Sequence, residues 1–193
     1  MKVSFGQKIP IALTQIQNKS TEEFEPATIY EVDCKDEYDY TELKKDRLDW
    51  NFSWYISENM RCKYLTFNHY NYIDDKNLFY VLRNQNNEDI GRIHIEEKTN
   101  NAFAIEWLDT KDDNGYRFIG QTLLATVAKE VLNKGGKAFI IQGAVDDAIP
   151  FYKHVCRFTD CGEYGFHMDE QQMKDFIART EKRTNGPIID LRV

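Results

Sequence analysis

The most informative segment of the sequence reads Asp112-Asp113-Asn114-Gly115-Tyr116-Arg117-Phe118-Ile119-Gly120-Gln121-Thr122-Leu123-Leu124. A polar loop here leads into residues whose apolar members, among them Ile119, Leu123 and Val127, recur at the spacing of an amphipathic helix. The first helical turn carries no large polar side chain, so its unsatisfied backbone N–H groups and its partial positive charge are open to an anion. Gly120 allows a pyrophosphate to approach the backbone closely. The segment therefore predicts a phosphate-binding turn at the start of a helix over 119–132.

Strand and helix signals surround this turn in a regular order. Apolar alternation and continuous apolar runs predict strands over 9–16, 28–34, 78–82, 90–96, 102–108, 138–141 and 164–168. Helical patterns predict helices over 40–48, 54–65, 119–132, 146–155 and 169–182. Short polar turns between the strands predict an antiparallel meander, and the apolar run at 138–141 predicts a strand in the middle of the sheet. The expected fold is α/β (α+β), a mixed and mostly antiparallel sheet flanked by helices, with an extra N-terminal β-hairpin.

Length and composition favour one main domain. The chain has 193 residues, of which 41 % are hydrophobic and 13 % aromatic, enough to bury a full core. We expect an N-terminal β extension over 1–26, a main domain over 27–182 and a C-terminal tail over 183–193.

A second informative segment lies downstream and reads Asp147-Ala148-Ile149-Pro150-Phe151-Tyr152-Lys153-His154-Val155-Cys156-Arg157-Phe158. Together with the run from Tyr116 to Thr122, it resembles the Gcn5-related N-acetyltransferase (GNAT) superfamily. The phosphate loop of that family reads Arg or Gln, two residues, Gly, one residue, then Gly or Ala. Its later helix reads Asn-x-x-Ala-x-x-Phe-Tyr-x-x-x-Gly-Phe, and the spacing from Ala148 to Tyr152 is preserved here.

The chain departs from the two family motifs at three places. Thr122 replaces the small last residue of the phosphate loop, which would narrow the phosphate cradle. Arg157 replaces the glycine before the last aromatic residue, and Asp146 or Asp147 stands where the family often has Asn. These changes would alter the turn and the contacts to pantetheine.

The resemblance implies an acetyl-CoA site. In this family the tyrosine of the second motif, here Tyr152, hydrogen-bonds the CoA sulfur and can protonate the departing thiolate, a role suited to a positioned phenol. The alternative is a core tyrosine with a satisfied hydroxyl. Backbone groups of two β-strand residues would meet the acetyl and pantetheine portion. The residues expected to bind the cofactor are Trp107, Leu108, Tyr116, Arg117, Phe118, Ile119, Gly120, Gln121, Thr122, Asp147 and Phe151.

A proton acceptor is also needed, because an amine attacks a thioester only in its neutral form. Glu106 is the first candidate, since it lies in the strand before the phosphate loop, in alternation with Ala104 and Leu108, and burial there would raise its pKa. The alternative is that Glu106 forms a salt bridge or faces solvent. Glu96, His94 and Tyr164 are further candidates.

The acceptor side is predicted from the resemblance and from composition. In this fold the acceptor pocket is framed by the first two helices, a region that here combines rings with acids. Such a combination suits a cationic amine, although core rings and solvated acids give the same pattern. The residues concerned are Tyr38, Tyr40, Trp50, Phe52, Trp54, Tyr55 and Tyr64, with Asp36, Glu37, Asp39, Glu42 and Asp49.

Charge and hydropathy limit the partners. The net charge of -7 would repel a polyanion, so we expect no nucleic-acid partner. No apolar run approaches the roughly 18 to 20 residues of a membrane span, and the first residues lack a secretory signal, so we expect a cytoplasmic protein without a membrane partner. We expect no metal, since the loose set His154, Cys156, Cys161 and His167 lacks the compact spacing of zinc ligands.

The expected function is that of an acetyl-CoA-dependent N-acetyltransferase acting on a primary amine of a small molecule or a protein, with a homodimer as the candidate assembly. The first alternative is a non-catalytic acyl-CoA-binding or protein-interaction module of the same fold. A second is a toxin-like transferase that acetylates aminoacyl-tRNA, which would need a basic face.

Overall fold

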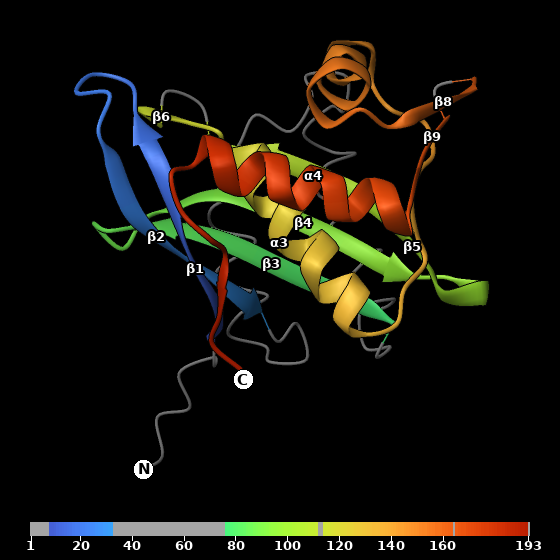
Figure 1. The fold of residues 1–193 in the computed structure, drawn as a ribbon, viewed down its shortest axis with the longest axis horizontal. Helices are drawn as coiled ribbons and strands as arrows, with labels where there is room; N and C mark the ends of the chain where they lie inside the picture. Colours follow the sequence, from blue (N-terminus) through green and yellow to red (C-terminus); the bar gives the residue numbers. More distant parts are fainter. Residues whose placement is uncertain (1–7, 33–75, 112–113, 164, 193) are drawn as a thin grey trace, which may run out of the picture.

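The computed structural model describes residues 8–32, 76–111, 114–163 and 165–192. Within these residues the centre of the molecule is one mixed, mostly antiparallel sheet with the strand order β10-β1-β2-β3-β4-β5-β7-β9-β8 (Figure 1). The short strand β6 pairs with β1 away from this path. The predicted helices over 40–48 and 54–65, together with the aromatic and acidic residues of the expected acceptor side, lie outside the described residues.

The antiparallel part of the sheet follows the predicted meander. Its strands are β1 (Lys8–Asn18), β2 (Phe24–Val32), β3 (Asn77–Asn84), β4 (Asp89–Glu97) and β5 (Ala102–Thr110). Each pairs with the next in antiparallel register, and β1 with β2 forms the predicted N-terminal hairpin. Strand β2 runs across the expected boundary between 26 and 27, so the hairpin continues directly into the main sheet.

The second part of the sheet follows the helix α3 (Ile119–Asn133). Strand β7 (Ala138–Ile141) lies in the middle of the sheet, as its continuous apolar sequence predicts, and it pairs with β5 in parallel register. Strands β9 (Gly165–Asp169) and β8 (Thr159–Gly162) extend the sheet beyond it. The helix α4 (Glu170–Arg183) then begins at a capping box, in which Asp169 accepts from the Gln172 N–H at 2.8 Å and Gln172 accepts from the Asp169 N–H at 2.9 Å.

The two long helices cover one face of the sheet. Figure 1 shows α3 and α4 side by side across this face, and α3 contacts β1, β3, β4 and β5 while α4 contacts β7 and β9. The apolar side chains that recur along α3 are fully buried, among them Leu123 and Val127. On the other face Phe79 and Val81 form a second cluster with Tyr30 and Trp107.

A tight turn ends α3 and directs the chain into β7. Gly135 has a φ of +77°, and the Gly136 N–H donates to the Val131 carbonyl at 2.8 Å, which is the predicted glycine stop. A Cβ on Gly136 would lie 2.8 Å from that carbonyl oxygen and 2.9 Å from Phe103. The glycine is therefore required for the close approach of helix and sheet that sets β7 beside β5.

Three short strands and one divided helix depart from the sequence prediction. Strands β6 (Tyr116–Arg117), β8 and β10 (Ile189–Asp190) were not expected. The predicted helix over 146–155 consists of the 3₁₀ turn η3 (Asp146–Ala148) and the π-helical turn η4 (Phe151–Cys156). Pro150 lies between them, and proline lacks the N–H that a continuous helix needs.

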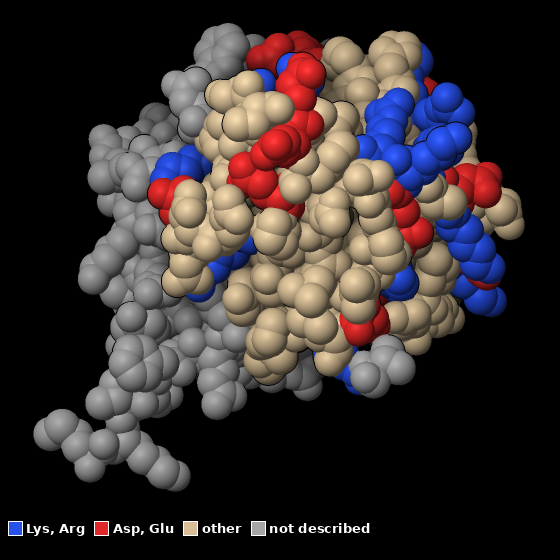
Figure 2. All heavy atoms as spheres, turned by 60° about the vertical axis from the view of Figure 1, so that its left-hand side comes forward, with Lys and Arg blue, Asp and Glu red and all other residues tan. Residues whose placement is uncertain are grey.

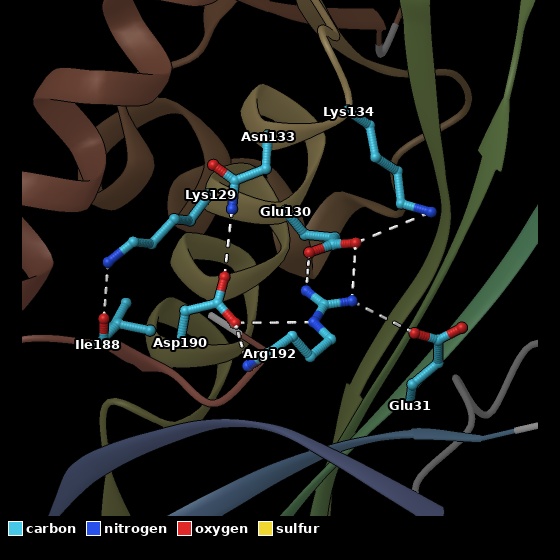
Figure 3. Close-up of polar contacts among 8 residues, drawn as sticks. All are labelled: Glu31, Lys129, Glu130, Asn133, Lys134, Ile188, Asp190 and Arg192. Atoms are coloured by element: carbon cyan, nitrogen blue, oxygen red, sulfur yellow. Dashed lines mark hydrogen bonds and ion pairs between the residues drawn. The ribbon is translucent and has the colours of Figure 1, made fainter.

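The segment after α4 is anchored to the sheet and to α3. Strand β10 pairs with Ala12 and Leu13 of β1, and the Ile188 carbonyl accepts from the Lys129 ammonium at 2.6 Å. Figure 3 shows Arg192 reaching the carboxylate of Glu130, which is 5 % exposed on α3, through both terminal nitrogens of the guanidinium, with one N–O distance of 3.0 Å. The carboxylates of Glu31, Asp190 and Glu130 thus surround one arginine.

Replacing Arg192 by methionine should lower the free energy of unfolding by about 2 kcal/mol, because the buried Glu130 carboxylate loses its bidentate partner. The expected loss is smaller than for a fully buried pair, since the Arg192 side chain is 34 % exposed and Lys134 remains 3.8 Å from Glu130. Urea unfolding measures the change. The control is Lys174→Met, which removes an exposed pair with Glu170 and should leave the midpoint unchanged. Equal midpoints for the two variants would contradict the anchoring role.

Candidate functional site

Strands β5 and β7 pair over a short distance and then part. Their parallel register joins Ala102, Phe103 and Ala104 to Ala138, Phe139 and Ile140, whereas β5 runs on to Thr110. Beyond Ala104 the β7-facing edge of β5 therefore has no strand partner within the described part of the chain.

A β-bulge coincides with the point at which the strands part. His94 of β4 pairs with Trp107, but its neighbour Ile95 pairs with Ile105, so Glu106 is an extra residue in β5. A bulge bends its strand and increases the local twist. It accounts for the change in direction that separates β5 from β7.

The N-terminus of α3 has no side-chain cap among the described residues. Its N-cap residue Phe118 is in the left-handed region with φ 69° and offers no side-chain cap, and the first turn contains no acidic residue. The Thr122 N–H donates to the Phe118 carbonyl at 2.8 Å and makes the first helical bond, so the N–H groups of residues 119–121 have no partner within the helix. This is the donor arrangement that an anion requires.

Three elements converge on Gly120. A Cβ placed there would lie 3.4 Å from the Phe151 ring of η4 and 3.8 Å from Leu108 of β5. The N-terminus of α3, the part of β5 beyond its pairing with β7, and the start of η4 are therefore adjacent. The structure brings together three of the residues expected to bind a cofactor, although they are 12 to 43 positions apart in the sequence.

The other expected cofactor residues differ in how they could contribute. Ile119, Gln121 and Thr122 are buried, and the Thr122 side chain is 0 % exposed, so it lies inside the core and does not narrow the entrance. Arg117 is exposed, 3.9 Å from Glu22. Asp147 is exposed on η3, and Tyr116 turns its hydroxyl toward Glu25.

Tyr152 lies on η4, next to Phe151, with 6 % of its surface exposed. Its ring packs against Phe151 at 5.3 Å, Phe158 at 5.8 Å and Phe166 at 5.9 Å between centroids. Burial raises the pKa of Tyr152, so its hydroxyl remains protonated and able to donate. Within the described residues this hydroxyl has no hydrogen-bond partner.

Glu106 does not lie in the buried environment that its alternation with Ala104 and Leu108 predicts. Its carboxylate is 32 % exposed and lies 3.2 Å from the Lys98 ammonium, which also contacts Glu96 at 2.5 Å. The structure thus shows the salt-bridged alternative for Glu106. Lys98 was not foreseen, because its place beside the bulge depends on the register of β4 and β5.

The further proton-acceptor candidates lie in different settings. His94 is 3 % exposed and stacks on Phe79 with 4.5 Å between centroids. Burial, followed by the nearby Lys98 charge, lowers the pKa of His94 to about 3, so it is neutral at physiological pH. Tyr164 lies outside the described residues.

Charge is unevenly distributed over the described surface. Figure 2 shows basic side chains gathered toward the side of the molecule that carries α3 and α4. Three arginines meet where η4 ends: the Arg179 guanidinium donates to the Cys156 carbonyl at 3.0 Å, Arg157 follows directly, and Arg183 is one turn further along α4. The net charge alone therefore does not describe the field that a partner would meet on this side.

The part of the chain that the structure describes lacks two further kinds of functional feature. It contains no group of three or more His, Cys, Asp and Glu side chains arranged to hold a metal ion. No described helix has the length and apolar character needed to cross a bilayer.

Comparison with known proteins identifies the fold. The chain resembles an acetyltransferase of the GNAT family from Staphylococcus aureus (TM-score 0.58, 17 % identity, 75 % of this chain and 99 % of that one). It also resembles the spermidine/spermine N-acetyltransferase of Vibrio cholerae (0.56, 13 %, 77 % and 96 %) and the PaiA N-acetyltransferase of Thermoplasma acidophilum solved with coenzyme A (0.55, 16 %, 73 % and 96 %). No family model and no curated protein matches the sequence. The described chain therefore has the GNAT fold, as its two motifs predicted.

Proposed function

We propose that the protein is an acetyl-CoA-dependent N-acetyltransferase that transfers an acyl group to a primary amine of a small molecule or a protein. The observation that carries the proposal is the meeting of Gly120, Leu108 and Phe151 where β5 leaves β7. The same place combines the uncapped N-terminus of α3, the edge of β5 that β7 leaves, and Tyr152, whose ring packs on Phe151. These are the donors needed for a pyrophosphate, a pantetheine chain and a leaving thiolate, respectively.

Each group has a defined task in this proposal. Acetyl-CoA would supply the activated acyl group as a thioester. The N–H groups of residues 119–121 would bind the pyrophosphate, and the β5 edge at Trp107 and Leu108 would hydrogen-bond the pantetheine amides. As the amine nitrogen bonds to the acyl carbon and the C–S bond breaks, the Tyr152 hydroxyl would protonate the sulfur. Glu106 would take the amine proton, directly or through water.

A non-catalytic acyl-CoA-binding module is the second candidate. It is favoured by the position of Glu106, whose carboxylate is exposed and already engaged by Lys98. The same cofactor contacts would then serve to hold acyl-CoA without transfer.

Calorimetry with CoA and thiol release from acetyl-CoA distinguish the two candidates. We expect saturable CoA binding and thiol release with at least one member of an amine panel. The panel should contain polyamines, because a spermidine/spermine acetyltransferase shares the fold, together with aminoglycosides and lysine peptides. Binding without turnover would support the second candidate. Absence of CoA binding would contradict both.

Glu106→Gln tests the assignment of the proton acceptor within the leading proposal. If Glu106 takes the amine proton, kcat should fall about 100-fold near neutral pH while the dissociation constant of CoA stays within twofold. The control is Glu96→Gln, which removes the other carboxylate bound by Lys98 and should leave kcat within about threefold. An equal effect of the two substitutions would show that the charge of the cluster matters and that Glu106 is not the base.

A further inference from the structure

The N-terminal hairpin is attached directly to the turn that precedes α3. Gln17 and Asn18 of β1 pair with Arg117 and Tyr116 of β6, and the Lys19 N–H donates to the Gly115 carbonyl at 2.8 Å. The turn is therefore held by residues that come about 100 positions earlier in the chain. Its conformation depends on the hairpin.

One side chain of the hairpin connects three elements. The Glu25 carboxylate on β2 accepts hydrogen bonds from Asn18 Nδ2 at 2.8 Å, from Gln85 Nε2 at 2.9 Å and from the Tyr116 hydroxyl at 3.0 Å. These donors belong to β1, to the turn between β3 and β4, and to β6. A carboxylate that accepts several hydrogen bonds holds its donors more firmly than a neutral group does.

Tyr116 transmits this restraint to the helix entrance. Its side chain is 8 % exposed, and its N–H donates to Asn114 Oδ1 at 2.7 Å. Burial, followed by the Glu25 carboxylate, raises the pKa of Tyr116, so its hydroxyl remains a donor throughout the physiological range. Only Arg117 and the N-cap Phe118 separate Tyr116 from the first residue of α3.

We infer that Glu25 is a positioning residue of the phosphate-binding turn: by holding Tyr116 it fixes the N–H groups of residues 119–121 in the orientation that receives the pyrophosphate. The inference rests on the proposed function. It makes the N-terminal hairpin a working part of the cofactor site.

The sign of the effect separates this role from simple electrostatics. A carboxylate near an anion site opposes anion binding by charge alone, so its removal would strengthen CoA binding. Loss of positioning instead weakens binding, because the N–H groups no longer converge. The two explanations predict opposite changes in the CoA dissociation constant for Glu25→Ala.

The experiment compares four single variants, and the double variant of Glu25→Ala with Tyr116→Phe, by calorimetry with CoA and by amide hydrogen exchange in the free protein. Glu25→Ala removes all three acceptor contacts, and Tyr116→Phe removes one hydroxyl with little risk to folding. Gln85→Ala removes a donor to the same carboxylate from the side away from the turn. Glu23→Ala removes a neighbouring exposed acid of the hairpin and is the charge control.

We expect Glu25→Ala and Tyr116→Phe each to weaken CoA binding about tenfold and to speed exchange in residues 114–122. The double variant should bind CoA no more weakly than the weaker-binding single variant, since both substitutions remove the hydrogen bond between Tyr116 and Glu25. Gln85→Ala and Glu23→Ala should stay within twofold of the parent protein. Tighter CoA binding in Glu25→Ala, or unchanged exchange in both variants, would overturn the inference. If the parent protein binds no CoA, the proposed function fails, and the exchange data still decide the positioning role.

Discussion

Replacing Tyr152 by phenylalanine should lower kcat for acetyl transfer about 100-fold and leave the CoA dissociation constant within twofold. The substitution removes only the hydroxyl that would protonate the sulfur, and general-acid catalysis typically contributes at least two orders of magnitude. The ring contacts with Phe151, Phe158 and Phe166 are retained, so the fold should be preserved. Thiol release at saturating acetyl-CoA measures the effect.

Tyr80→Phe is the matched control. Tyr80 is also buried, and within the described residues its hydroxyl has no hydrogen-bond partner, so its removal should leave kcat unchanged and stability equal or higher. Because burial raises the pKa of Tyr152, we further expect no loss of kcat between about pH 8 and 10 through ionisation of this group. If Tyr152→Phe and Tyr80→Phe are equally active, the Tyr152 hydroxyl does not take part in the reaction.

Replacing Gly120 by aspartate should weaken CoA binding at least about 100-fold. A carboxylate in the first turn would occupy the place proposed for the pyrophosphate, and two like charges about 4 Å apart repel by several kcal/mol near a protein surface. The same carboxylate interacts favourably with the helix dipole, so the helix itself should not be destabilised by its charge. Calorimetry at low ionic strength gives the largest difference.

Gly120→Asn isolates the charge from the size of the new side chain. Both side chains would meet Phe151, whose ring lies 3.4 Å from the expected Cβ, so both should lose some affinity through crowding. Asparagine should lower the affinity for CoA only about tenfold, and the difference in CoA affinity between the two variants should become smaller as salt is added. Indistinguishable dissociation constants for Asp and Asn would show that no phosphate binds at this helix end.

The central part of the fold was predictable because its signals are local. The spacing of Ile119, Leu123 and Val127 determines the buried face of α3, and the glycines at 135 and 136 end it. The continuous apolar run at 138–141 similarly predicts a strand inside the sheet, and β7 lies between β5 and β9 with Phe139 and Ile141 buried. Each of these features depends only on residues that are close together in the sequence.

Glu106 shows why the candidate site was predicted less well. Strict alternation places Glu106 with Ala104 and Leu108, but the bulge inserts it as an extra residue and interrupts that alternation. No local pattern marks the bulge, which depends on the pairing of β5 with β4. The contact of Glu106 with Lys98 and the contacts of Glu25 likewise depend on how the strands pair, which no local pattern marks.

Strand β1 has consequences for the order in which the chain can fold. Its edge partners are β6 and β10, which come from the middle and the far end of the described sequence. Contacts between such distant segments form slowly, because a long loop must close before the contact is gained. During synthesis, β1 would leave the ribosome long before either partner, and its edge would stay open to other chains until residues 189–190 arrive. Rapid release or chaperone protection of the nascent chain should therefore raise the yield of folded protein more than changes within the central helix.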